Sequence, residues 1–269
     1  MQLFKANNTN NSYFYDVRID HNIELSPKRI SQTILLLSFL FVFPICTNAQ
    51  NNLLNGYSIG ADIGTNGIGL NLATGLKANK RKFSNGLSLN INTLHHPQET
   101  KVQNQRRANP KAYVFGKLNA AGVVRISYDF KYKLGQPKLG SPSLHYGFSV
   151  GPNIGLLKPY YIGFEDPEAQ ISQPQIVQQN EYTNEYQEYI YGPASWTRGF
   201  SELNPKLGLN IDLHFIVNWN NSFHFKEWKS GIRADYFPNK FKILYNSDKK
   251  VFASLYTSYS IGRYSHKIA

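Results

Sequence analysis

The sequence predicts an all-β fold: a transmembrane, up-and-down antiparallel β-barrel of about eight strands with long extracellular loops. Three observations predict it. Apolar residues alternate with small or polar residues at a period of two over eight segments of roughly ten residues each. The connections between these segments alternate between short and long. Charged residues make up 17% of the chain, well below the roughly 25% usual for soluble domains.

The alternating segments begin at Tyr57 and continue almost to the end of the chain. They span residues 57–64, 68–77, 83–92, 113–133, 144–156, 207–219, 228–236 and 251–262. In the clearest segment, 207–219, every odd position is apolar or aromatic, while Asp212 and His214 occupy even positions. A strand of ten residues is about 33 Å long and, tilted by roughly 40°, crosses an apolar layer of about 25 Å. The segments therefore match the thickness of an outer membrane.

The lengths of the connections predict which end of the barrel faces outward. The short connections are 79–82, 133–143 and 220–227, and the long ones are 95–112, 158–204 and 238–250. Apart from a tight turn at 65–67, short and long connections fall on opposite sides, which is typical of barrels with short periplasmic turns and long outer loops. A soluble β-sandwich or lipocalin-like barrel is the alternative, but its large apolar residues would lie inside.

Charged residues at the polar positions of the strands must face the interior. A one-residue slip in register would expose Arg125 and Lys131 to lipid, at roughly 2–4 kcal/mol each near the midplane. Because eight strands enclose only enough room for side chains, we expect a sealing network of ion pairs and hydrogen bonds rather than a channel or an active site. Asp212 and Arg233 lie at similar distances from the turn near residue 223, so we expect them at similar heights. The predicted interior set, structural in role, is Asp62, Arg125, Asp129, Asp212, His214, Arg233 and Asp235.

Residues 28–49 are predicted to be a secretory signal peptide. The apolar run at 34–45 is about 12 residues long, too short to span a bilayer as a helix, and it follows two basic residues and precedes small residues that suit cleavage before Gln50. Residues 1–27 form a polar extension, for which a wrongly assigned start is one explanation. Residues 50–269 are then the barrel, and the expected location is the cell outer membrane.

The sequence offers few candidates for chemistry. The single cysteine, Cys46, lies inside the predicted signal, so the mature chain is expected to have no disulfide, cysteine nucleophile or thiolate metal site. His95, His96 and Glu99 come nearest to a metal or acid–base cluster. Neighbouring residues on a strand point opposite ways, and Pro97 follows the histidine pair at once. We therefore expect these residues to have a structural role in the loop.

An enzyme inside such a barrel would need a nucleophile and a base. Ser149, His145 and Asp212 supply the residue types, but no nucleophile motif surrounds any of them. Inward-facing serines are also expected wherever side chains fill a barrel. We therefore predict a protein that is not an enzyme, with no catalytic residues, no cofactor and no metal.

The formal net charge of +12 bears on the partners. The basic residues are scattered and no nucleic-acid-binding signature accompanies them, so nucleic acid is not an expected partner. In an exported protein the charge suits the anionic headgroups of outer-membrane lipid and lipopolysaccharide, polyanionic surface glycans or a buried polar interior. One connection carries the basic residues Lys101, Arg106, Arg107 and Lys111. The acidic, tyrosine-rich connection 158–204 could bind an envelope protein or divalent cations, or form a solvated cover.

Several short strings show a resemblance to known proteins. They are TNAQ at 47–50, LHHPQE at 94–99, YVFGKLN at 113–119, GPNIGLLKPYYI at 151–162 and YTSYSIGRY at 256–264. Together they resemble a family of small outer-membrane β-barrel proteins of the Bacteroidota, over essentially the whole mature chain. Phe115 replaces the tyrosine expected before GKLN, and five residues follow Tyr264, where many barrels end on an aromatic residue. The resemblance implies fold and location, but no chemistry.

The expected function follows from these observations together. We expect a non-enzymatic barrel with a structural or accessory role in the cell envelope, in surface assembly or export. The first alternative is a surface-binding module acting through residues 158–204. The second is a lipid A-modifying barrel enzyme.

Overall fold

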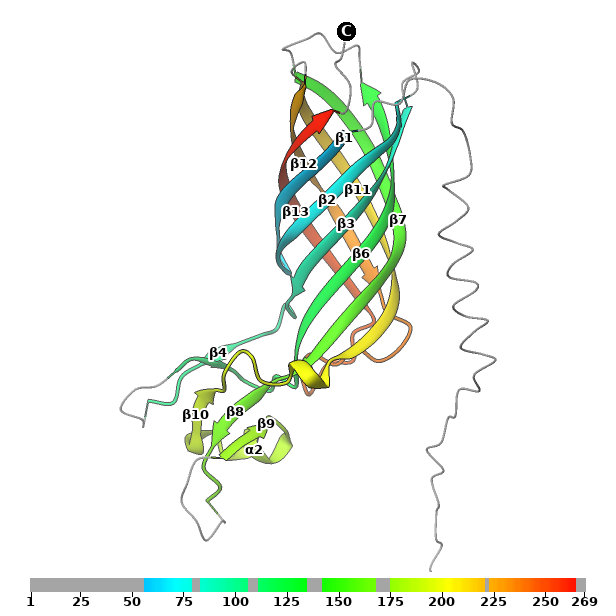
Figure 1. The fold of residues 1–269 in the computed structure, drawn as a ribbon. Coiled ribbons are helices and arrows are strands. Elements are labelled where there is room, and N and C mark those ends of the chain that lie inside the picture. The colour runs from blue at the N-terminus through cyan, green and yellow to red at the C-terminus, as the bar shows by residue number, and fades with distance from the viewer. Residues whose placement is uncertain are drawn as a thin grey trace, which may run out of the picture. The chain divides into compact units, whose positions relative to one another are not determined.

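A computed structural model describes residues 56–78, 83–105, 111–134, 142–167, 175–220 and 223–264. The described part of the chain forms a closed barrel in which every neighbouring pair of strands is antiparallel (Figure 1). The barrel strands are β1 (Gly56–Gly64), β2 (Gly67–Ala78), β3 (Phe83–Leu94), β6 (Asn119–Leu134), β7 (Pro142–Pro159), β11 (Asn204–Asn220), β12 (His224–Tyr236) and β13 (Val251–Tyr264). Consecutive barrel strands pair along the chain, and β13 closes the barrel against β1. The predicted fold class is confirmed.

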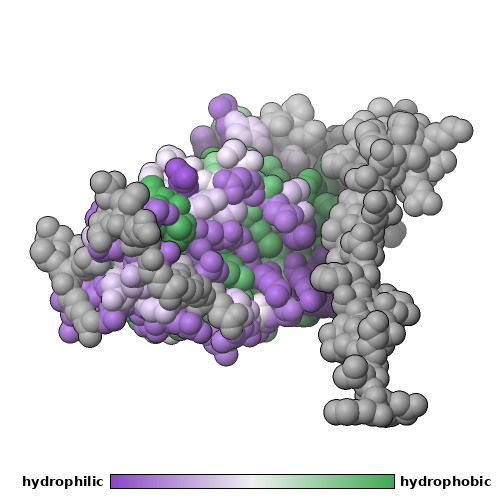
Figure 2. Space-filling model, turned by 90° about the horizontal axis from the view of Figure 1, so that it is seen from below, coloured by the Kyte–Doolittle hydropathy of each residue, from purple (hydrophilic) through white to green (hydrophobic). Residues whose placement is uncertain are grey.

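The barrel has an apolar exterior and a polar interior. On β11, Leu209, Ile211 and Leu213 are exposed, whereas Asn210 and Asp212 between them are buried. The two faces separate because successive side chains of a strand point to opposite sides of the sheet. Seen from the loop end, the molecule is mostly hydrophilic, and hydrophobic residues of the barrel show on its flank (Figure 2). This polarity is the reverse of a soluble β-barrel.

The fourth predicted segment, 113–133, was wrong in its extent. The structure places Tyr113 and Val114 in a short strand, β5 (Tyr113–Val114), which pairs with β4 (Lys101–Val102) outside the barrel. The barrel strand begins only at Asn119. Gly116 breaks the run, because its φ of +68° is a left-handed conformation that glycine adopts without strain.

The long connection between β7 and β11 folds into a small unit of its own, where the sequence predicted only a long loop. Its sheet has the order β10-β8-β9, formed by β8 (Tyr161–Phe164), β9 (Gln175–Gln178) and β10 (Ile190–Pro193). It also contains α2 (Glu181–Glu185), η1 (Gln187–Tyr189) and η2 (Phe200–Glu202). Ile162, Phe164 and Ile190 bury their side chains together with Tyr113 of the neighbouring loop. No helix among the described residues is long and apolar enough to cross a membrane.

An apolar cluster, here called the aromatic plug, fills the loop end of the barrel. Phe237 and Phe241 stack with their ring centroids 4.2 Å apart, and Phe252 packs edge-on against both rings. Gly155 of β7 makes room for them, since a Cβ atom there would clash with the Phe241 ring. The members of the plug are Leu94, Val114, Val123, Leu157, Phe237, Phe241, Ile243, Leu244 and Phe252.

At the opposite end of the barrel, Phe225 of β12 and Tyr264 of β13 narrow the interior. Their ring centroids lie 4.8 Å apart. Gly262 of β13 allows this contact, because any Cβ atom at that position would clash with the Phe225 ring. Aromatic side chains therefore narrow the interior near both ends. The predicted extension (1–27), the predicted signal peptide (28–49) and Cys46 lie outside the described residues.

Candidate functional site

The interior of the barrel holds a cluster of buried charged side chains, and one of its ion pairs joins β6 to β12. Arg125 donates from Nε and Nη2 to the two carboxylate oxygens of Asp235, each at 2.7 Å. Asn153 of β7 donates to the same carboxylate at 2.8 Å. Arg125 is 2% exposed and Asp235 is 1% exposed. The contact is therefore a buried, two-pronged ion pair, the geometry that best compensates a desolvated carboxylate.

A second guanidinium, that of Arg233, is shared between two carboxylates. Its Nη1 donates to Asp62 of β1 at 2.9 Å, and its Nε donates to Asp212 of β11 at 3.3 Å. Arg233 lies directly opposite Asp212 in the pairing of β11 with β12. The guanidinium carbon also lies 4.0 Å from the ring centroid of Tyr256, a cation–π distance.

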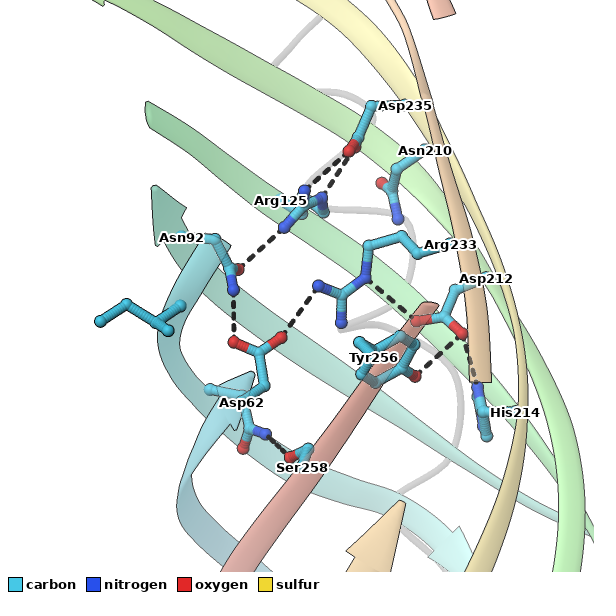
Figure 3. Close-up of polar contacts among 12 residues, drawn as sticks. Asp62, Asn92, Arg125, Asn210, Asp212, His214, Arg233, Asp235, Tyr256 and Ser258 are labelled. Atoms are coloured by element: carbon cyan, nitrogen blue, oxygen red, sulfur yellow. Dashed lines mark hydrogen bonds and ion pairs between the residues drawn. The ribbon is translucent and has the colours of Figure 1, made fainter. Parts of the chain in front are cut away.

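Neutral side chains join the two ion pairs into one chain of contacts (Figure 3). Asn92 of β3 accepts from Arg125 Nη1 at 2.8 Å and donates to Asp62. At the far end, Tyr256 donates its hydroxyl proton to Asp212 at 2.9 Å, and His214 Nδ1 lies 3.3 Å from the same carboxylate oxygen. Strands from all around the barrel are thereby linked through its centre.

Asp129, also in the predicted interior set, is buried but lies apart from this chain. Its carboxylate accepts a hydrogen bond from Ser88 at 3.2 Å. A further ion pair, between Lys131 and Glu227 at 3.0 Å, lies nearer the short-turn end. Glu227 was missed because residues 220–227 were assigned to a connection. Extending the alternation of β12 two positions back from Lys229 would have placed Glu227 on the inner face.

The interior leaves little space for a ligand. A cavity among Asp62, Asn92, Arg125 and Arg233 has a volume of about 10 Å³, which is room for about one water molecule. Buried ion pairs require close packing and full hydrogen bonding to offset their desolvation. The arrangement can therefore link strands and obstruct passage, and the cavity among these four residues is too small for a substrate.

The three residues that an enzyme would have required do not form a catalytic group. Ser149 lies directly opposite Asp212 in the pairing of β7 with β11. His145 lies four positions away from Ser149 on the same strand, roughly 13 Å at about 3.3 Å per residue. In the described structure, no hydrogen bond joins Ser149 to a histidine.

The outer-loop residues His95, His96 and Glu99 do not converge on a metal. The His95 side chain is exposed, whereas His96 is buried with its Nε2 atom 2.9 Å from Ser247 Oγ. Glu99 accepts from Lys117 Nζ at 2.9 Å and lies 3.4 Å from His95 Nδ1. No group of three or more histidine, cysteine or acidic residues within the described ranges could hold a metal ion.

These contacts shift the pKa values of Glu99 and His96. Burial raises the pKa of Glu99, but the hydrogen bonds from His95 and Lys117 outweigh it and lower the pKa to about 2. Burial and the nearby Lys249 lower the pKa of His96 below its ordinary value, although Glu99 opposes that shift. The cluster therefore acts as a polar clamp between connections, with Glu99 charged and His96 neutral at neutral pH.

No protein-family model matches the chain, and no curated protein sequence matches it. The match with Neisserial surface protein A covers 78% of this chain and 94% of that protein, with 9% identity and a TM-score of 0.36. The match with the N-terminal β-barrel domain of Pseudomonas aeruginosa OprF covers 78% of this chain and 97% of that domain, with 10% identity and a TM-score of 0.35. The match with Ail, the attachment invasion locus protein of Yersinia pestis, covers 78% of this chain and 96% of that protein, with 10% identity and a TM-score of 0.32.

The described strands form a closed, eight-stranded antiparallel barrel whose apolar side chains face outward.

Proposed function

We propose that the protein resides in the outer membrane as a non-enzymatic barrel with a structural or accessory role in the cell envelope. The observation that carries the proposal is the reversed polarity of the barrel. Large apolar side chains such as Leu207, 66% exposed, and Ile63, 63% exposed, cover its outer face. Charged side chains fill its interior. In water this arrangement would expose the apolar face, whereas in a bilayer both faces are matched to their surroundings.

A solute channel is disfavoured by the same interior. The chain of contacts from Asp235 to Asp212 crosses the barrel, the aromatic plug fills the loop end, and Phe225 and Tyr264 narrow the other end. Eight strands leave no additional width around such side chains. A role that needs a stable, closed barrel fits better than a role in transport.

A surface-binding module is the second candidate, and one observation favours it. The connection between β7 and β11 has its own sheet and packs around a hydrophobic core that it shares with Tyr113 of the neighbouring loop, so it is built to hold a shape. It also exposes apolar side chains, including Ile176 and Tyr191. A solvated cover would need neither feature.

Excision of residues 162–193 separates the two roles. Ala194 N donates to Tyr161 O at 2.9 Å, so a short Gly-Ser turn can join the ends without moving either one. The excised protein should insert and show heat-modifiable migration on a gel like the full chain. Envelope integrity, scored as resistance to detergent and large antibiotics, is compared among the full chain, the excised chain and a deletion of the gene.

The structural role requires the excised protein to restore integrity. If excision behaves like gene deletion although the barrel still inserts, the binding role replaces the structural role. A full-length mature protein that stays soluble without detergent would contradict the membrane assignment altogether. Mass analysis of lipid A with and without the gene tests the enzyme, and a changed lipid A would overturn the non-enzymatic assignment. Membership of a Bacteroidota barrel family stays a prediction from the quoted strings.

A further inference from the structure

An exposed cluster of aromatic and basic side chains lies where the outer connection rejoins the barrel. It consists of Lys158, at the end of β7, and Trp196, Arg198, Phe200 and Leu203, which lead into β11. We call it the rim anchor. It belongs neither to the aromatic plug nor to the sheet β10-β8-β9, and the function proposed above does not use it.

Lys158 holds the segment against the outside of the barrel. Its neighbour Leu157 is buried in the aromatic plug, so Lys158 points outward from the strand. Its Nζ atom donates to the carbonyl oxygens of Trp196 at 2.6 Å and Arg198 at 3.2 Å. The same ammonium lies 4.9 Å from the ring centroid of Phe200 and 5.7 Å from that of Trp196. These contacts fix the segment on the membrane-facing side of the rim.

Gly199 allows this close approach. Its φ of +84° is a left-handed conformation that favours glycine, and a Cβ atom there would lie 3.0 Å from Pro159 O. Both features require a residue without a side chain where the segment touches the end of β7. The segment is therefore built to lie against the barrel.

The anchor nevertheless leaves its aromatic rings exposed. Trp196 is 76% exposed and packs edge-on against Phe200 with centroids 4.9 Å apart. Leu203 is also exposed, and the outward residues that follow it at the start of β11 are Pro205, Leu207 and Leu209. The apolar exterior of the barrel thus continues directly into the anchor. Tryptophan at such a boundary suits the headgroup level of a bilayer, since its ring is apolar and its N–H is polar.

The cations of the anchor are available to an anion. Neither Lys158 nor Arg198 forms an ion pair with another described residue. Arg198 stacks over the Tyr161 ring at 5.4 Å, and the nearby carboxylate of Glu202 accepts the Tyr161 hydroxyl at 2.7 Å. Lys158 Nζ can donate three hydrogen bonds, and the two carbonyl oxygens accept only two of them. Basic side chains directly above an apolar, tryptophan-bearing surface complement a phosphate held above acyl chains.

We propose that the rim anchor binds the phosphorylated headgroup of an outer-leaflet glycolipid and thereby sets the depth of the barrel in the membrane. The proposal rests on the membrane location proposed above. It places the lipid contact at the junction of β7 and β11. The aromatic rings enter the boundary of the acyl chains, and the two cations meet the phosphate.

Depth-dependent quenching of Trp196 tests the proposal. Trp219→Phe and Trp228→Phe together leave Trp196 as the one tryptophan of the chain. This variant is folded into phosphatidylcholine vesicles brominated at shallow or deep acyl positions, with or without bisphosphorylated lipid A. We expect stronger quenching by the shallow bromines, and a further blue shift of emission when lipid A is present. If no bromine quenches the emission of Trp196, the proposal is wrong. This also holds if Trp196 is shielded from aqueous iodide, because a second copy or another protein, not lipid, would then cover the ring.

Charge variants test the phosphate contact. In the same background, Arg198→Gln should remove most of the lipid A-dependent shift, and Lys158→Gln with Arg198→Gln should abolish it. The matched control, Lys249→Gln with Lys250→Gln, removes the same charge from exposed residues elsewhere and should leave the shift intact. Equal shifts in all variants would overturn the proposal.

Heat-modifiable migration is recorded for every variant in the series. Failure of the unaltered chain to insert counts against the membrane location, whereas an inserted barrel with unquenched Trp196 counts against the anchor alone. Arg198→Gln leaves the Lys158 contacts to backbone oxygens in place, so it remains informative if Lys158→Gln impairs folding.

Discussion

Replacing Arg233 by methionine should destabilise the barrel more than replacing either of its partners. The substitution keeps much of the side-chain volume but leaves Asp62 and Asp212 without their shared guanidinium. Removing one member of a buried ion pair typically costs about 3–5 kcal/mol. Asp212→Asn leaves Arg233 paired with Asp62 at 2.9 Å. It therefore loses one charge-assisted contact, at about 1.5–3 kcal/mol.

A comparison of two double-mutant cycles sharpens this expectation. Arg125 and Asp235 share two hydrogen bonds of 2.7 Å, whereas Arg233 and Asp212 share one of 3.3 Å. The coupling energy should therefore be larger for Arg125→Met with Asp235→Asn, on the order of 3 kcal/mol. For Arg233→Met with Asp212→Asn it should be about 1–2 kcal/mol.

Reversible urea unfolding in phospholipid vesicles, followed by tryptophan fluorescence and gel migration, measures these energies. Ser230→Ala, at a partly exposed position of β12, serves as a control away from the ion pairs. If Asp212→Asn costs as much as Arg233→Met, then Arg233 is not shared between two carboxylates. Strict additivity in both cycles would show that the contacts do not couple the strands.

Three further outcomes are expected. Gly155→Ala should lower the free energy of unfolding by about 1–3 kcal/mol by overpacking the aromatic plug, whereas Gly122→Ala, whose added Cβ would meet no atom closer than 3.5 Å, should be nearly neutral; equal effects would count against a tightly packed plug. Because Glu99 is charged more readily in the folded loop, with a pKa of about 2 against an ordinary 4.5, its contribution to loop stability should be complete above about pH 4.5 and lost as pH falls toward 2. In the wild type, protease cleavage of the loops should increase as pH falls through that window, whereas in Glu99→Gln the cleavage rate should not depend on pH in this way. Parallel curves of cleavage rate against pH for the two proteins would refute the clamp. Planar-bilayer recordings of the wild-type barrel should show no stable ohmic conductance, and a reproducible pore would contradict a filled interior.

The membrane-spanning part was predictable because its constraints are local and periodic. Along β11, successive side chains face lipid and the packed polar interior in turn, so exchanging Leu209 with Asn210 would cost stability. The same alternation placed Asp212 and Arg233 at similar heights, and the structure sets them opposite each other. Periodicity does not reveal which side chains touch across the centre. The link from Arg125 through Asn92 to Asp62 depends on how the strands close in space.

The outer connections were predictable only in length. Tyr113 continues an alternating pattern, yet it leaves the barrel because Gly116 turns the chain and because Ile162 and Ile190 offer it a separate core. That core is assembled from residues almost 80 positions apart in sequence. The rim anchor likewise depends on Lys158 reaching a backbone carbonyl 38 residues further on. No spacing rule relates such positions.

The aromatic plug also constrains the order of assembly. Phe237, Phe241 and Ile243 come from the connection between β12 and β13, and Phe252 comes from β13 itself. The pairing of β13 with β1 joins the two ends of the described chain, so its loop-closure entropy is the largest in the barrel. Until β13 pairs with β1, the outer end of the barrel is not fully enclosed around the aromatic plug, and Arg233 of β12 lacks its ion-pair partner Asp62 of β1. The barrel therefore closes, its outer end is enclosed and its internal ion pairs are completed in one late step of assembly.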